Sequence, residues 1–330
     1  MCRRGCGGCG SLVHSPLTVC PSVVDICHYS TTLGGDLPTE ILEPLRLLTK
    51  HSAIREPPAS QETFASLEAN LRIYLANNAL RSLPAILFDF NNLRVLSVRH
   101  NDLTEIPPAI ARLRNLESLN VANNKLQYLP YEVLELVRFG KLSYLLAEPN
   151  PWRAAQPSEM CTGTDDVPVQ RILPLPSGTI HHVQKVAQSI PDYFRNDGTP
   201  IPQAANGTMP SELTRGSFSQ SLTQTALLRC CHQQDLADLP EWLLDDLPPN
   251  VRKLLESARV IQESGGRVCT LCRREMVMPR KQWIEWWSMS AYHAHSTPTS
   301  NSDKVYPFLR QQCALACADS GTPSPEAVKS

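Results

Sequence analysis

Apolar and polar positions repeat along residues 70–140 with a period of 23 residues. Three asparagines mark this period, Asn78, Asn101 and Asn124, and each lies within the same frame of apolar residues. The frame around Asn101 contains Leu93, Leu96, Val98, Leu103, Ile106, Ile110 and Leu113, and the frame around Asn124 has an aliphatic residue at every matching position. An amphipathic helix or strand does not repeat at so long an interval, so the pattern predicts a stack of equivalent coils.

Each frame fits the leucine-rich repeat L-x-x-L-x-L-x-x-N-x-L-x-x-L-P. Its first aliphatic residues belong to a short strand whose alternate side chains point inward. The asparagine follows the strand, where its amide can bond backbone groups that would cost about 1–3 kcal/mol each if left buried and unpaired. A proline then begins the return segment outside the sheet, at Pro84, Pro107 and Pro130. We therefore predict an α/β solenoid, a short horseshoe of three full coils and one degenerate coil.

Both ends of such an array need a cover, because a terminal coil leaves its apolar edge open. Residues 61–69 are predicted to form a helix that closes the N-terminal end with Phe64 and Leu67. In the degenerate last coil the turn asparagine is displaced to Asn150, and Trp152 is expected to cover the core. The inward positions of its strand are assigned to Phe139, Leu142 and Tyr144.

The strands should form a concave sheet from which alternate side chains project toward solvent. The candidate protein-binding residues on this face are Arg72, Tyr74, Val95, Ser97, Arg99, Ser118 and Asn120, continued on the fourth coil by Lys141, Ser143 and Leu145. Tyr74 and Arg99 are the expected anchors, since tyrosine and arginine are favoured at interface hot spots. The alternative is a sheet face that is only solvated.

Composition divides the chain into five parts. They are a disordered N-terminal tail with a short helix (1–60), the repeat domain with its caps (61–152), a proline-rich linker (153–217), a helical and cysteine-pair module (218–318) and a disordered tail (319–330). Residues 179–193 are a candidate ordered piece within the linker. We expect the second module to be small and mostly helical, with three tryptophans on one helical face, either buried or exposed as an anchor for a partner: Trp283, Trp286 and Trp287.

Two cysteine pairs lie in this module, Cys269-x-x-Cys272 and Cys313-x-x-x-Cys317. A C-x-x-C pair can place both thiolates on one metal, and a second pair can complete a tetrahedral, all-cysteine zinc site. The four residues are therefore candidate ligands of a structural zinc ion, with His293 and His295 as alternative ligands. The other interpretation is four reduced thiols packed as small apolar residues. A RING-type ubiquitin ligase would need eight ligands in two interleaved sites.

Several functional classes receive no support from the sequence. The net charge of −1 does not indicate a nucleic-acid partner for the whole chain. No run of 18 apolar residues exists, so no membrane span is predicted. Walker, Rossmann, H-E-x-x-H and nucleophile-elbow motifs are missing, so we do not predict an enzyme. Twelve cysteines occur, none of them within residues 61–152, which favours a reducing, cytoplasmic location.

The repeats resemble the Ras-group type of leucine-rich repeat proteins, which act as signalling scaffolds. In combination with residues 269–287 and 307–317, they are also similar to a fungal family of uncharacterised leucine-rich repeat proteins with a cysteine-containing C-terminal module. The resemblance implies a binding role without a known activity. We therefore predict an intracellular scaffold or adaptor in signalling that binds an unknown protein partner. The alternative is a zinc-stabilised adaptor that binds nucleic acid or is associated with a ubiquitin ligase.

Overall fold

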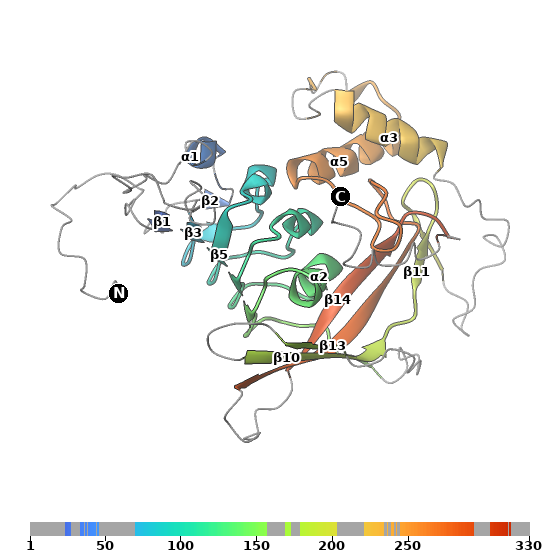
Figure 1. The fold of residues 1–330 in the computed structure, drawn as a ribbon. Helices are drawn as coiled ribbons and strands as arrows, with labels where there is room; N and C mark the ends of the chain where they lie inside the picture. The colour runs from blue at the N-terminus through green and yellow to red at the C-terminus, as the bar shows by residue number, and fades with distance from the viewer. Residues whose placement is uncertain are drawn as a thin grey trace, which may run out of the picture.

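The computed structural model describes residues 70–156, 179–202, 221–233, 245–293 and 304–315, with shorter pieces between residues 24 and 45, at 169–172, between 236 and 242, and at 317. Two large sheets, a small two-stranded sheet and several helices make up this part of the chain (Figure 1). The predicted helix at 61–69 and the predicted tail at 319–330 lie outside the described residues.

The first sheet is parallel and holds one strand from each coil of the repeat. Its order is β1 (Val24–Cys27), β3 (Leu71–Tyr74), β5 (Leu93–Ser97), β6 (Ser118–Asn120) and β8 (Tyr144–Leu146). Inward residues such as Leu71, Ile73 and Leu96 are fully buried, whereas Arg72 between the first two is exposed. The repeat pattern thus places its aliphatic residues in one continuous core, as predicted for a solenoid.

The return segments of the coils form the convex side. They are the 3₁₀ helices η3 (Ala85–Asp89) and η4 (Pro108–Arg112), followed in the third coil by β7 (Leu129–Pro130) and the α-helix α2 (Tyr131–Arg138). Pro84, Pro107 and Pro130 stand in extended backbone directly before these helices, where proline removes no helical hydrogen bond.

The turn asparagines connect each coil to the coil before it. The Asn101 amide donates to the carbonyls of Val98 in its own coil and Leu75 in the preceding one, both at 2.9 Å, and its Oδ1 accepts from the Leu80 N–H at 3.1 Å. Asn124 repeats these bonds one coil later. Asn150 does the same for the fourth coil, donating to Val121 at 3.0 Å and to Ala147.

The N-terminal end of the array is extended by short segments from residues 24–45. The strand β1 pairs with β3, and β2 (Gly34–Gly35) pairs with β4 (Ala79–Leu80). A short helix, α1 (Thr39–Leu42), follows, and Leu37, Leu42 and Leu45 are buried in the core of the array. The structure therefore differs here from the expected disordered tail. This piece lacks the asparagine and the leucine spacing of the repeats, so its pattern gave no sign of a coil.

The second sheet is built around two long antiparallel strands, β13 (Lys281–His293) and β14 (Lys304–Gln312). On its other edge β13 pairs with β10 (Thr179–Gln188) and β11 (Asp192–Phe194), which are continued by β9 (Val169–Ile172) and β12 (Pro200–Ile201). Segments that we assigned to a proline-rich linker thus belong to the sheet. Residues 179–193, expected to be an ordered piece, supply a large part of it.

The prediction of a helical face for the three tryptophans is wrong. Trp283, Trp286 and Trp287 all lie on β13 and are buried. Trp287 belongs to the core of the array, whereas Trp286 packs with Ala187 on the other face of the strand. Their spacing suits a helix, but aromatic residues also favour strands, and pairing with β10 and β14 decides the outcome.

Two helices complete the module, α3 (Leu222–Gln233) and α5 (Pro249–Glu263), with a small core of their own around Leu227 and Ile261. Gly265 ends α5 with a φ of 90°, which favours glycine. A Cβ on Gly265 would lie 2.8 Å from the Ala109 Cβ, so the helix ends in close contact with the convex side of the array. Because the module combines these helices with a sheet, the expectation of a mostly helical fold is not confirmed.

The two sheets share one core. Val183, Trp287, Tyr306 and Phe308 pack in the same cluster as the leucines of the repeats. β14 also pairs in parallel with β7, Phe308 opposite Leu129. Trp152 is partly buried and meets the Tyr306 ring edge to face at 5.8 Å. The C-terminal end of the array is therefore closed by Trp152 together with the second sheet.

Candidate functional site

The predicted binding residues form rows across the concave sheet. Strand pairing aligns Arg72 with Val95 and Ser118, and Tyr74 with Ser97 and Asn120. Arg72 is exposed; Tyr74, Val95, Ser118 and Asn120 are half-buried; and Ser97 is buried between its neighbours. Arg99 follows β5 and is exposed. The face therefore offers separate exposed side chains on a flat surface.

The fourth coil continues these rows with residues that we did not predict. Tyr144 pairs with Ser118, and Leu146 pairs with Asn120. Tyr144 is 48% exposed and Leu146 is 55% exposed, whereas Ser143 is buried. The outward assignment of Ser143 and Leu145 and the inward assignment of Tyr144 are therefore wrong by one position, whereas Lys141 is exposed.

The shift in register has a local cause. The N–H groups of Ser143 and Tyr144 both bond to the Glu117 carbonyl, at 3.0 and 3.1 Å, so two residues oppose one at the start of the strand. A slip of one residue exchanges the two faces of a strand. Phe139, also assigned to an inward position, is 58% exposed, whereas Leu142 is buried as expected.

Four of the five strands of the concave sheet carry no acidic residue. β3, β5, β6 and β8 contain no Asp or Glu and contribute Arg72 and Arg94, whereas β1 contains Asp25, which pairs in register with Arg72. Arg94 is paired with Glu117 at 3.0 Å, just outside the sheet. The exposed Arg72 and Arg99 lie near Tyr74, and the apolar surface of Tyr144 and Leu146 lies at the far end of the same face.

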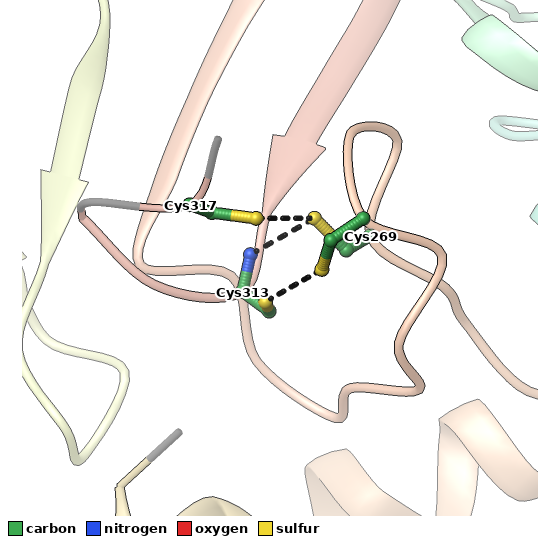
Figure 2. A group of neighbouring side chains, drawn as sticks. Cys269, Cys313 and Cys317 are labelled. Atoms are coloured by element: carbon green, nitrogen blue, oxygen red, sulfur yellow. Dashed lines mark hydrogen bonds between the residues drawn. The ribbon is translucent and has the colours of Figure 1, made fainter. Parts of the chain in front are cut away.

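The four paired cysteines of the C-terminal module meet at one point. Cys269 and Cys272 come from the loop between α5 and β13, and Cys313 and Cys317 follow β14 directly (Figure 2). All four sulfur atoms lie within 4.8 Å of one another. The Sγ–Sγ distance is 3.8 Å for Cys269–Cys317 and 3.4 Å for Cys272–Cys313. Ligands at about 2.3 Å around a tetrahedral zinc ion would be about 3.8 Å apart.

Backbone hydrogen bonds fix the loop that carries the first pair. The Cys269 N–H donates to the Arg274 carbonyl at 2.8 Å, and the Arg273 N–H donates back to Cys269 at 3.0 Å. Arg273 adopts a φ of 62° to close this turn. Thr270 joins the loop to β14, because its N–H and its hydroxyl each donate to the Gln311 carbonyl at 2.9 Å. These bonds bring the loop beside Cys313.

The thiols perturb one another strongly. The Cys313 thiol and the N–H groups of Leu271, Cys272 and Cys313 hold the pKa of Cys269 well below its usual range. The pKa of Cys313 is raised, because its thiol donates to Cys269 and is buried. Burial raises the pKa of Cys317 to about 12. Of these thiols, Cys269 thus ionises most readily. A bound divalent cation would favour ionisation of the others as well.

Two buried carboxyl groups escaped the sequence analysis. Glu132 on α2 is 2% exposed, and burial raises its pKa to about 7. Burial would also raise the pKa of Glu285, but Arg310 and Lys185 outweigh it, and the pKa falls. The Glu285 carboxylate accepts hydrogen bonds from the indoles of Trp283 and Trp287, at 3.0 and 3.1 Å. In the sequence, only the position of Glu285 between tryptophans marked it as unusual. That position did not indicate which residues its carboxylate contacts.

Comparison with known proteins identifies the repeats. The sequence model described as "Leucine rich repeat" matches residues 69–126. A leucine-rich repeat protein of Leptospira interrogans, similar at 22% identity and a TM-score of 0.24, is covered over 30% of its length by 36% of this chain. No curated protein matches. The resemblance to fungal proteins with a cysteine module stays a prediction.

The match and the structure support the same coarse conclusions. Leucine-rich repeat proteins usually bind other proteins and are typically not enzymes. Within the part of the chain that the structure describes, no helix is long and apolar enough to cross a membrane. The coils around Asn78, Asn101 and Asn124, with their inward leucines and their column of asparagine hydrogen bonds, are leucine-rich repeats.

Proposed function

We propose that this chain is an intracellular adaptor that binds a protein partner on the concave face of its repeat array. The observation that carries the proposal is the charge and exposure of that face: β3, β5, β6 and β8 carry no acidic residue and present Arg72 near one end and Tyr144 and Leu146 at the other, and the one acidic residue on the five strands is Asp25 on β1. Charge complementarity favours an acidic segment with an aromatic or aliphatic residue as the partner. A role in signalling is part of this proposal.

The test removes the two expected anchors without disturbing the fold. Affinity capture from native lysate with the full chain should retain a set of partners that Tyr74→Ala/Arg99→Ala loses by at least tenfold. The control is Arg114→Ala, an exposed cation after η4 on the return segment. Both variants should melt within about 2 °C of the parent. Equal capture by the double variant would overturn the concave face as the binding surface.

We also propose that Cys269, Cys272, Cys313 and Cys317 bind a structural zinc ion. Four sulfurs within 4.8 Å of one another, on two segments held together by Thr270, provide a complete tetrahedral ligand set. Elemental analysis should find one zinc per chain, and Cys272→Ser should remove it. Cys230→Ser is the control, because Cys230 is exposed and lies outside the cluster. A metal-free parent would favour reduced, packed thiols.

The alternative functions have less support. Basic residues of the module contact their own chain: Arg273 bonds to Glu135, Arg280 bonds to Asn196, and Lys281 lies over the rings of Tyr193 and Trp283. They therefore do not form a free basic surface for nucleic acid. Among the described residues the cysteine cluster is the one group of candidate metal ligands, whereas a RING would need two.

A further inference from the structure

A cleft of about 460 Å³ lies between the repeat array and the C-terminal module, away from the concave face. The array contributes Glu105 and Tyr128 to its wall, and α5 contributes Lys253, Ser257 and Val260. The remaining wall comes from β11 and the β11–β12 connection, from the loop between α5 and β13, from the start of β13 and from the second half of β14. A volume of this size at the junction of two modules is typical of a small-molecule site.

Arg267 lies at the base of this cleft. Its Nη1 donates to the Val277 carbonyl at 3.3 Å, but its buried Nε finds no hydrogen-bond partner among the described residues. No ion pair holds Arg267 in the same part of the structure, although Glu105 is near enough to interact with its charge. Burial lowers the pKa of Arg267, since the guanidinium has lost water. A bound anion would compensate this loss.

Arg267 also lines a smaller cavity of about 20 Å³, together with Glu132, Thr270 and Gln311. That space is large enough for a single water molecule. An anionic group must therefore approach Arg267 from the larger cleft, where the guanidinium fork can bind both oxygens of a carboxylate.

The cleft wall is mixed, and its apolar part comes from a few residues. Val277 is buried, Met278 and Leu309 are half-buried, and Val260 is 53% exposed. Lys253, Ser257 and Val260 follow one another at helical spacing, so one face of α5 presents a cation near an apolar residue. Gln282 and Gln311 add amide groups. Such a site suits a ligand with one charged end and an apolar body.

The charges around the cleft limit the ligand's own charge. Glu105 and Asp197 line its wall, and Glu132 lies behind Arg267. These carboxyl groups would repel a dianion more strongly than a monoanion. We infer that the cleft binds a small amphipathic monocarboxylate, with the carboxylate on Arg267 and the apolar part against Val260, Met278 and Leu309.

The test is calorimetric titration of the full chain with three probes of one chain length: octanoate, octyl phosphate and octan-1-ol. Octanoate should bind saturably, and each of the other two should bind at least tenfold more weakly. Arg267→Gln should weaken octanoate by at least tenfold. The matched control is Arg252→Gln on the same helix as Val260, whose guanidinium pairs with Asp245 and Glu256.

Val260→Glu keeps the inference testable even if Arg267→Gln does not fold, because position 260 is exposed and lies on the cleft wall. This variant should also weaken octanoate at least tenfold through repulsion and loss of apolar contact. Octanol binding as tightly as octanoate would overturn the inference, as would unchanged octanoate affinity in Val260→Glu or the absence of saturable binding by the parent. Tighter binding of octyl phosphate would contradict the monocarboxylate.

Discussion

The repeat array and the C-terminal sheet share one core, but they are held together by contacts of different range in the sequence. In the array, contacts join residues about one period apart, as when Asn124 in one coil bonds the Val98 carbonyl in the coil before it. In the second sheet the partners are distant in sequence: Lys185 pairs with Trp287, and Leu129 pairs with Phe308. The array is therefore held by interactions that recur, and the sheet by interactions that occur once.

This difference should separate their stabilities. A coil that loses one bond keeps its neighbours, because stability in a stacked array is spread over many similar interfaces. The sheet has no such redundancy, and the cysteine cluster joins its last strand to the loop before β13. The module should therefore depend on a few particular residues.

Removal of the proposed zinc ion should give the largest effect. A strong chelator, or Cys272→Ser, should destabilise the module by several kcal/mol, because structural zinc sites contribute directly to folding. Hydrogen exchange should then rise in β14 and residues 267–276, while β5 and β6 stay protected. Equal loss of protection in both regions would show that the two cannot unfold separately.

Asn101→Ala should have the next largest effect, about 3 kcal/mol, because it leaves the buried Leu80 N–H without its bond and removes one of the two amide bonds that each of the Leu75 and Val98 carbonyls accepts. Asn78→Ala is the matched comparison. Among the described residues the half-buried Asn78 amide bonds only within its own coil, to the Leu75 and Ala76 carbonyls, so its loss should cost less. Urea denaturation measures both, and equal costs would contradict coil-to-coil bonding as the source.

Glu132→Gln should change stability in a pH-dependent way. The pKa of Glu132 is about 7 in the folded chain and 4.5 in the unfolded one, so the folded state binds this proton more tightly. The stabilisation is complete below pH 4.5 and is lost as the pH rises through 7. Glu132→Gln should thus be more stable than the parent by roughly 2–4 kcal/mol at pH 8. The difference should disappear near pH 4.5.

Thermal melts across this pH range check the prediction, with Glu117→Gln as the control. Glu117 is exposed and paired with Arg94, so its substitution should leave the pH dependence unchanged. If Glu132→Gln changed the stability by the same amount at every pH, the change would come from packing and not from ionisation of Glu132.

Arg273→Ala should have the smallest effect. Arg273 on the cysteine loop pairs with Glu135 on α2, but its side chain is nearly half exposed, so the pair should contribute less than about 1 kcal/mol. A double-mutant cycle with Glu135→Gln measures the coupling. A value above 2 kcal/mol would mean that this contact controls docking of the module.

What could be predicted from the sequence follows the same division. Asn101, Asn124 and their leucines repeat, so each coil confirms the assignment of the next. The cysteines were identified by spacing alone, and the structure brings all four together. The fourth coil shows the limit: Tyr144 and Leu146 face outward because two N–H groups share the Glu117 carbonyl, a detail that no spacing records.

The second sheet lay beyond such reasoning for a physical reason. Trp283, Trp286 and Trp287 fit a helix as well as a strand, and the partners of Trp286 and Trp287 on β10 are about one hundred residues away in the sequence. Arg267, Glu132 and Glu285 gained their importance only from burial, which depends on how the module meets the array. A single sequence contains no pattern that indicates how the module packs against the array.

The pairing of β7 with β14 restricts how this protein can change in length. A coil inserted after residue 138 would carry Leu129 away from Phe308 and open the junction. A duplicate of residues 78–100 would leave that junction intact and simply lengthen the horseshoe upstream. In evolution or by engineering, the concave face can therefore be extended by coils upstream of β7, but not by coils between α2 and β8.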